Sequence, residues 1–343
     1  MTNKMPIAGL ALMLGISPSA AQAHVKWFCA YNETGSPVIL LNVLCQNFEQ
    51  LVLIAIGMLL VGLLIEGSPI GLAMMRSLDR TTGLLRSNTE LLIRFVTGSF
   101  FLSLALMPHF GMKSVLLTPE LTTGMTFVPW LQLIIALTMF SRRLLPLATV
   151  GMVFLFALAI QQYGIFHLMD YPIFLGLAAY LGCKGMKQLC RSVRPLDLLR
   201  WATSVTLMWA AIEKWAYPEW TDPLFISHPG LSLGLDIDFF MRAAGVVEFT
   251  LAFALLCTPL VRRVSAVILA AMFIAAIAEF GMIDAIGHSC IIVVMLAVLS
   301  DNECSPIRRR TFFLTPLSYS AALATFLLGY YGLHSVIFGT VLG

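Results

Sequence analysis

Ten apolar segments follow one another along this 343-residue chain, and they restrict it to a membrane fold. A helix needs about 20 apolar residues to cross the hydrocarbon core of a bilayer. The charged residues make up 11% of the chain, whereas a soluble chain has about 25%. We therefore predict an all-α, polytopic helical bundle with ten transmembrane helices, a lipid bilayer as its surroundings and no nucleic-acid partner. The approximate limits of the segments are 38–65, 91–110, 126–140, 144–163, 170–185, 197–216, 239–258, 262–282, 286–300 and 313–341.

The first 23 residues have the pattern of a secretory signal peptide. Lys4 supplies a positive start, an apolar run covers residues 7–16, and Ala21-Gln22-Ala23 matches a cleavage site. The run is too short for the alternative, an uncleaved first anchor. We expect the mature chain to begin at His24, on the outer side of the membrane.

The distribution of basic residues tests the orientation of the bundle. If the chain starts outside and alternates, sixteen of its 21 lysines and arginines lie in inner loops or at inner helix ends. On the outer side this leaves Lys26, Lys113, Lys214 and Arg242. This bias follows the positive-inside rule. It predicts the inner membrane of a bacterium, with both mature termini in the periplasm.

The chain also repeats itself. Leu91–Phe95 matches Asp197–Trp201, and Gln162–Ile165 matches Glu279–Met282. Predicted spans 2–5 and 6–9 are thus two tandem copies of a four-helix unit, related by an axis along the membrane normal. The predicted parts are the signal peptide (1–23), an N-terminal periplasmic segment with the first span (24–90), the first repeat (91–190), the second repeat (191–304) and the last span (305–343).

The six histidines all fall on the predicted outer side: His24, His109, His167, His228, His288 and His334. Histidine is the commonest metal ligand, although it also collects at membrane interfaces. Asp284 and His288 are four residues apart and share a helix face, just after Glu279. The equivalent turn of the first copy carries His167 and Asp170. These residues predict a metal or proton site between the repeats, or alternatively a hydrogen-bonded pair in which Asp284 caps its helix.

A mature chain that begins at His24 offers two nitrogens, the α-amine and ring Nδ1, to one metal ion. The α-amine titrates at about 7.7–8.0, so a metal displaces its proton at neutral pH. A third nitrogen from His167 or His288 would complete a tetragonal set that suits Cu(II). This arrangement is similar to the histidine brace of lytic polysaccharide monooxygenases, periplasmic copper-binding domains and the membrane methane monooxygenase. The alternative is a frayed chain end, which the interfacial aromatic residues Trp27 and Phe28 disfavour.

The cysteines divide between the two sides of the membrane. Cys183, Cys190, Cys257 and Cys304 are predicted to face a reducing cytoplasm. On the outer side, a disulfide between Cys29 and Cys45 would tie the N-terminal segment to the first span. Cys290 is expected to be a buried thiol rather than a ligand beside His288.

Two acidic residues near or within spans suggest proton transfer or structural ion pairs. Glu213 and Lys214 are adjacent and point to different helix faces, so each needs its own partner. Glu248 lies in the predicted seventh span, far from the inner arginines. Buried acids in membranes act as proton relays or as paired charges, and both roles remain open for Glu213 and Glu248.

The stretch Arg242-Ala-Ala-Gly245-Val-Val-Glu248-Phe-Thr-Leu-Ala252 resembles the DoxX-like superfamily of small four-helix membrane proteins. It departs where Ala252 replaces the expected glycine, and the first copy lacks the motif. The resemblance covers spans 6–9 well and spans 2–5 loosely. It implies association with quinol-linked sulfur oxidation or with small-molecule redox stress.

The leading prediction is a periplasm-facing copper site that serves copper binding, uptake or delivery. His24 would chelate the metal, and the further ligands would come from His167, Asp170, Glu279, Asp284 and His288. A periplasmic copper or redox protein is the expected partner, and oxidase activity at the same site is left open. The first alternative is a quinone-linked oxidoreductase subunit in which Glu213, Glu248 and His288 move protons. The second is a small-molecule permease.

Overall fold

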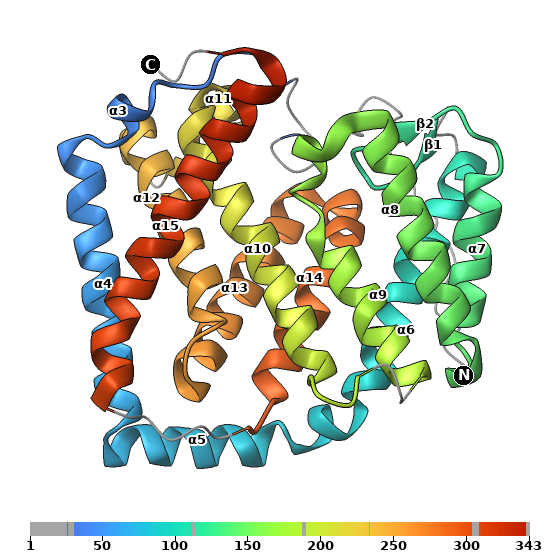
Figure 1. The fold of residues 1–343 in the computed structure, drawn as a ribbon, viewed down its shortest axis with the longest axis horizontal. Coiled ribbons are helices and arrows are strands. Elements are labelled where there is room, and N and C mark those ends of the chain that lie inside the picture. Colours follow the sequence, from blue (N-terminus) through green and yellow to red (C-terminus); the bar gives the residue numbers. More distant parts are fainter. Residues whose placement is uncertain are drawn as a thin grey trace, which may run out of the picture.

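The protein is a bundle of helices, seen in a computed structural model that describes residues 26, 31–110, 114–186, 190–232, 234–303 and 309–340 (Figure 1). The elements are α3 (Leu40–Val43), α4 (Gln46–Glu66), α5 (Pro69–Thr81), α6 (Gly83–Leu106), η1 (Met107–Phe110), β1 (Val115–Leu116), β2 (Thr122–Thr123), α7 (Val128–Thr138), η2 (Arg142–Leu144), α8 (Leu145–Leu168), α9 (Pro172–Gly185), α10 (Pro195–Ala216), η3 (Pro218–Thr221), α11 (Asp222–Ser227), η4 (Pro229–Ser232), α12 (Ile237–Ala254), α13 (Pro259–Phe280), α14 (Met282–Ser300) and α15 (Arg309–Phe338).

Each of the ten predicted apolar segments coincides with a helix. Among the residues that the structure describes, six helices are long and apolar enough to cross a membrane, and α7 and α9 are apolar but shorter. These helices agree with the prediction of an all-α membrane bundle. That all ten apolar segments cross the membrane stays a prediction. The six are Asn47–Glu66, Gly83–Phe110, Arg142–Leu168, Pro259–Phe280, Met282–Ser300 and Thr311–Phe338.

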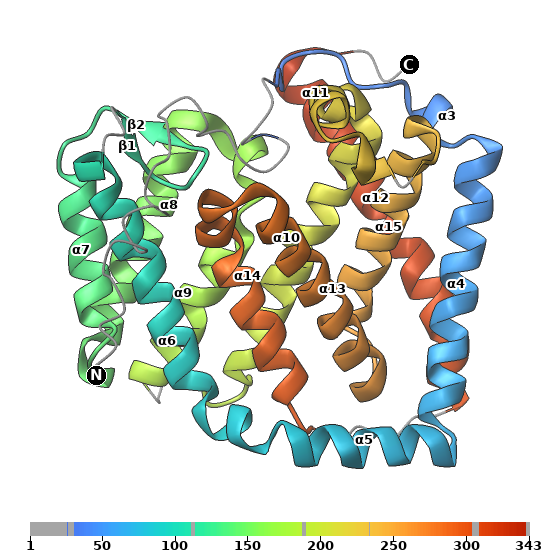
Figure 2. The same ribbon diagram turned by 180° about the vertical axis from the view of Figure 1, so that it is seen from behind.

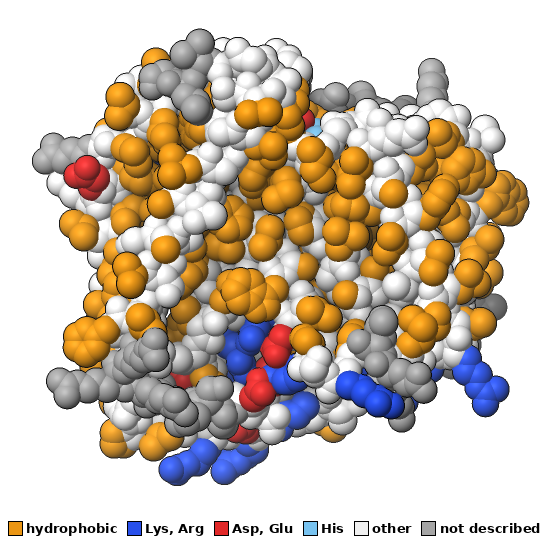
Figure 3. All heavy atoms as spheres, in the orientation of Figure 1, with side chains coloured by type: hydrophobic (Ala, Val, Ile, Leu, Met, Phe, Trp, Pro, Cys, Tyr) orange, Lys and Arg blue, Asp and Glu red, His pale blue; other side chains and the backbone are white. Residues whose placement is uncertain are grey.

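Figure 3 shows apolar side chains over the middle of one face of the bundle and Lys and Arg side chains along its lower edge. This separation is compatible with an apolar belt in contact with lipid and a basic rim at one end of the bundle. Following the predicted orientation, we call the lower end, which carries α5, the inner end. The opposite end is the outer end.

Helix α5 lies across the inner end of the bundle, crosswise to the helices above it (Figures 1 and 2). Ser68 caps it by accepting a hydrogen bond from the Gly71 amide, and Pro69 occupies its first position. The helix is amphipathic, with exposed Ile70 and Leu72 and the charged residue Asp79. The sequence predicts that residues 66–90, between the first two spans, form an inner loop. The structure shows instead a short helix of the kind that lies in a membrane interface.

The helices of the two predicted copies pack in a reciprocal arrangement, and the repeat itself stays a prediction. Helix α6, the first of copy one, packs on α14, the last of copy two, and α10 packs on α9 in the reciprocal way. Gly164 and Gly281, which the sequence match pairs, also adopt similar backbone conformations. Their φ and ψ are 85° and 162° at Gly164, and 82° and −148° at Gly281. Glycine alone enters this region easily, so both copies break the chain at the same point.

An aromatic layer in the core joins α8, α10 and α15 near the outer end. The ring of Phe166 lies 5.4 Å from Trp209 and 4.9 Å from Tyr330, measured between centroids. Trp209 and Tyr330 are 4.8 Å apart. These buried rings hold the outer ends of three helices that are distant in the sequence.

A disulfide joins Cys183 to Cys190, with 5.4 Å between their Cα atoms. The sequence placed both residues in a reducing compartment, and the structure instead pairs them across a short loop. Cys290 is a buried thiol, as expected. Cys29 lies outside the described residues, so a disulfide with Cys45 stays a prediction.

Candidate functional site

A buried lysine at the outer end contacts three carboxylates. Lys26 Nζ lies 2.9 Å from Glu33 Oε1, 2.5 Å from Asp170 Oδ2 and 2.7 Å from Glu213 Oε1. The Lys26 side chain is 5% exposed. It therefore holds together the N-terminal segment, the turn between α8 and α9, and the outer end of α10.

His167 extends this group to a fourth carboxylate. Its Nδ1 lies 2.6 Å from Glu33 Oε2, and its side chain is 3% exposed. Its Nε2 is 2.9 Å from Glu120 Oε1 but is not aligned for a hydrogen bond there. The hydroxyls of Tyr31 and Tyr171 donate to Glu120, Tyr31 at 2.7 Å. We call this group the outer cluster; its members are Lys26, Glu33, Glu120, His167, Asp170 and Glu213.

Local sequence explains how the turn after α8 reaches the cluster. Gly164 interrupts α8 with an extended, positive-φ conformation, which redirects the last turn that carries His167. Pro172 then starts α9, where the missing amide hydrogen of proline costs nothing. Asp170 lies in the short turn between these two signals. Glycine and proline thus place His167 and Asp170 side by side.

Glu120 is held by a small hairpin between α6 and α7. Strands β1 and β2 pair antiparallel, with Leu116 opposite Thr122. At the tip, the Thr118 hydroxyl accepts a hydrogen bond from the Leu121 amide at 3.0 Å. The hairpin tip therefore directs Glu120 toward His167.

The outer cluster contains more acid than base, since four carboxylates meet one lysine and one histidine. Burial opposes ionisation of Glu33 and Glu120, but nearby Lys26 and His167 outweigh it. They lower the pKa of Glu33 and bring that of Glu120 to about 2. Burial also disfavours the Lys26 ammonium, yet Asp170, Glu213 and Glu33 raise its pKa well above the usual value.

Asp170 has the opposite shift from Glu33 and Glu120. Burial raises its pKa, and the attraction of Lys26 does not offset this. Its Oδ1 atom is buried and has no hydrogen-bond partner. A cluster with surplus carboxylates and a proton held more tightly on one of them is suited to taking up a cation or exchanging protons.

The structure brings some of the predicted metal ligands together and separates others. His167 and Asp170 both belong to the outer cluster. Asp284 and His288 pair with each other, with 2.9 Å between Oδ2 and Nδ1, and the His288 ring packs on Phe273. Asp284 thus binds His288 along α14 rather than capping the helix.

Glu279 lies apart from the outer cluster. It is 47% exposed, and its Oε1 is 3.8 Å from His228 Nε2 at the outer end of α13. The prediction that the turn brings Glu279 beside the Asp284–His288 pair has no support in these contacts. His24 lies outside the described residues, so its part in the site stays a prediction.

The two acids considered for proton transfer have different surroundings. Glu213 joins Lys26 in the outer cluster, whereas Glu248 Oε2 lies 2.8 Å from Lys214 Nζ. Adjacent Glu213 and Lys214 therefore have separate partners, as their opposite helix faces require. Glu248 acts as the counter-ion of Lys214.

Sequence reasoning missed Lys26, Glu33 and Glu120 as members of the site. Lys26 carried one signal, because it was one of the basic residues that broke the positive-inside pattern. Glu33 and Glu120 lie in outer segments without periodicity, so no local pattern marked them. Their partners are far away in the sequence; Lys26 and Asp170 are separated by 144 residues.

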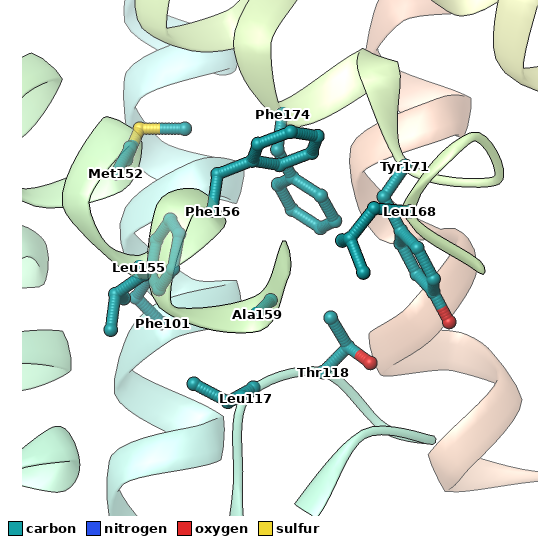
Figure 4. A pocket seen from close by; sticks show the side chains of 10 residues that line it. All are labelled: Phe101, Leu117, Thr118, Met152, Leu155, Phe156, Ala159, Leu168, Tyr171 and Phe174. Carbon is teal, nitrogen blue, oxygen red and sulfur yellow. The ribbon is translucent and has the colours of Figure 1, made fainter. Parts of the chain in front are cut away.

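A small apolar pocket adjoins the cluster through Tyr171 (Figure 4). Its volume of about 30 Å³ has room for about one water molecule. Pockets for organic ligands usually have about 300–1,000 Å³. In this conformation the pocket therefore does not admit a quinone ring. Its lining is Phe101, Leu117, Thr118, Met152, Leu155, Phe156, Ala159, Leu168, Tyr171 and Phe174.

No family model, curated protein or solved structure matches the chain. The resemblance of Arg242–Ala252 to the DoxX-like superfamily therefore stays a prediction from the sequence.

Proposed function

We propose that this membrane protein binds a metal ion, copper in the first place, at the outer end of its bundle, and that it takes part there in copper uptake or delivery. One observation carries the proposal. Lys26 is anchored inside the outer cluster, beside His167 and four carboxylates. Two residues of chain span at most about 7 Å between Cα atoms, so a chain cleaved after Ala23 would have its first residue, His24, within that distance of the Cα of Lys26, whose side chain enters the outer cluster.

The surroundings of His167 suit a metal ligand. Nδ1 faces Glu33 at 2.6 Å, while the buried Nε2 lies 2.9 Å from Glu120 Oε1 without an aligned hydrogen bond, so a metal ion there would displace the ring proton that faces this carboxylate. Metal-ligating histidines commonly donate their second ring N–H to a carboxylate, which fixes the tautomer and the ring orientation. Glu33 would thus orient His167, and Nε2 would join the amine and ring nitrogens of His24 in a three-nitrogen set that suits Cu(II).

The charge of the outer cluster supports cation binding as well. Its carboxylates attract cations to the outer end. Before a metal arrives, Lys26 and a His167 ring with a proton on each nitrogen offset part of this charge, and Asp170 holds a proton more tightly than usual. A metal ion at Nε2 would take the place of one of the ring protons. A bound copper ion would supply redox and Lewis-acid chemistry.

The alternatives have less support among the described contacts. In the quinone-linked hypothesis Glu248 moves protons, but it is the counter-ion of Lys214. Of the two acids in that hypothesis, Glu213 is the one that belongs to the outer cluster. A periplasmic copper or redox protein remains the expected partner.

The test measures copper and the mature N-terminus on protein purified from its native membrane. Intact mass should show a chain that starts at His24, and elemental analysis should find about one copper per chain. Inserting one alanine between Ala23 and His24 moves the α-amine away from the histidine. This insertion and His167→Ala should each abolish stoichiometric copper, while the matched control His228→Ala should retain it.

Electron paramagnetic resonance of the copper-loaded protein should show nitrogen hyperfine coupling that changes in both variants. A mature chain that begins elsewhere would overturn the proposal. So would copper content that is unaffected by the alanine insertion.

A further inference from the structure

A polar pocket lies at the inner end of the bundle, at the opposite end from the outer cluster. Its volume of about 350 Å³ falls within the usual range for ligand pockets. The lining comes from α6, η2, α9, the segment before α10 and the end of α14, so it draws on both predicted repeats. The charged residues that line it are Arg86, Glu90, Arg142, Lys184, Arg194 and Asp301.

The basic side chains of this inner pocket outnumber its acids by four to two. Glu90 engages Arg142 through two contacts of 2.6 and 2.7 Å, and Asp301 accepts from Arg194 at 2.7 Å. Both acids that line the pocket are therefore already paired with an arginine. Arg86 and Lys184 supply the positive charge that the lining acids do not offset.

Lys184 has the fewest constraints of the four. Among the described residues, no carboxylate lies within ion-pair distance of its ammonium, which is 5.4 Å from the centroid of the Tyr180 ring. Arg86 is fixed by the Ser300 carbonyl at 2.8 Å and by Asp79 at 3.0 Å. A fixed guanidinium and an ammonium without a carboxylate partner form a suitable pair for an anion.

Other donors at the inner end also lack partners. The Nε and Nη1 atoms of Arg200 are buried without a hydrogen bond, as is Nε of Arg262. Asp197 pairs with Arg200 at 2.9 Å and lies 3.8 Å from Arg194, so these residues belong to the same charged region. Buried donors without acceptors are rare in folded proteins. They raise the positive potential around the inner pocket.

Exposed apolar side chains flank one of the residues that line the inner pocket. Phe140 is 82% exposed, and Leu144 is exposed as well; these two flank Arg142 in the chain. Basic pockets between membrane helices on the cytoplasmic side recognise anionic lipid headgroups. A phosphate held here would leave its acyl chains beside these apolar side chains.

We propose that the inner pocket binds the phosphate group of an anionic membrane lipid, which Lys184 and Arg86 contact from two different helices. The lipid headgroup would then join α6 and α9, the first and last helices of the first predicted repeat, at the inner end. The same phosphate chemistry is offered by free inorganic phosphate, and the exposed Phe140 and Leu144 beside Arg142 are the reason to favour a lipid. This inference does not depend on copper.

The experiment compares lipid binding by the full-length protein and three variants in native mass spectrometry. Protein in detergent is titrated with phosphatidylglycerol, cardiolipin or phosphatidylcholine, with and without millimolar inorganic phosphate. Lys184→Gln removes one charged donor and should weaken the first anionic lipid about tenfold, the loss of one charge-assisted hydrogen bond. Arg143→Gln is the matched control, because Arg143 is exposed at the same end and does not line the pocket.

The expected result is one tightly bound anionic lipid in the wild type and in Arg143→Gln, weaker binding in Lys184→Gln, and recovery in Lys184→Arg. Inorganic phosphate should not displace the lipid. Displacement by millimolar phosphate would show a small-anion site and overturn the lipid assignment. Equal binding of phosphatidylcholine, or unchanged binding in Lys184→Gln, would overturn the site itself.

Discussion

Replacing Lys26 with methionine tests whether the outer cluster depends on its buried ammonium. Methionine keeps most of the length of the side chain and removes the charge. Lys26 contacts three carboxylates within 2.9 Å, and all three would lose their counter-ion. Breaking a buried ion pair by removing one partner costs about 3–5 kcal/mol. Because three acids share this lysine, we expect about 5 kcal/mol at pH 8.

The loss of stability caused by Lys26→Met should be smaller at acidic pH. Without the ammonium, Glu33 loses one of the charges that lower its pKa, so it accepts a proton more readily. Asp170, whose pKa is already raised, does the same. Protonated carboxyls no longer repel each other, and the difference between Lys26→Met and wild type should shrink markedly by pH 5.

The assay is the apparent melting temperature of the detergent-solubilised protein at pH 8 and pH 5. A loss of this size should lower the melting temperature by about 5–10 °C at pH 8. Lys26→Arg keeps the charge and should melt close to wild type. Adding Asp170→Asn to Lys26→Met removes one of the orphaned charges and should restore part of the loss. If Lys26→Met melts within about 2 °C of wild type at pH 8, the ammonium does not hold the cluster together.

Two further predictions concern the site and its turns. The pKa of Glu120 falls from 4.5 to about 2 on folding, so its contribution to the free energy of unfolding is present above pH 4.5 and is lost as the pH falls toward 2. Between pH 5 and pH 3 the wild type should lose about 2 kcal/mol of stability through this group. Melting curves of Glu120→Gln should lack that part of the loss. Gly164→Ala and Gly281→Ala should each cost about 1–3 kcal/mol because of backbone strain, although nothing lies within 4 Å of the added Cβ. Gly329→Ala has equal space and no positive φ, so equal melting of all three alanine variants would contradict this reasoning.

The helices of the bundle were predictable because each apolar segment is a local signal. The break at Gly281 was also anticipated in part, since the match of Gln162–Ile165 with Glu279–Met282 pointed to equivalent turns. Helix α5 was not recognised because thirteen residues with several charges read as a polar loop when the helical period is not examined. Local pattern thus determined the type of each element but not every boundary.

The contacts of the candidate ligands could be predicted in part. Asp284 and His288 are four residues apart, so helical geometry alone brings them together. His167 and Asp170 were identified by residue type and by the repeat. Their actual partners could not be found in this way, because Lys26 and Glu213 are separated by 187 residues and meet through tertiary packing. Sequence spacing carries no information about such contacts.

His334 of α15 has a consequence for the order in which the protein is made. Its Nε2 lies 2.8 Å from the carbonyl oxygen of Glu33 and 2.7 Å from the Tyr217 hydroxyl. Glu33 and His334 are 301 residues apart, so a ribosome needs about 15–60 s to synthesise the chain between them. During that interval the carbonyl oxygen of Glu33 lacks its hydrogen bond with His334. The outer end is therefore completed after α15 enters the membrane, and a nascent chain that stalls before this helix lacks a finished site.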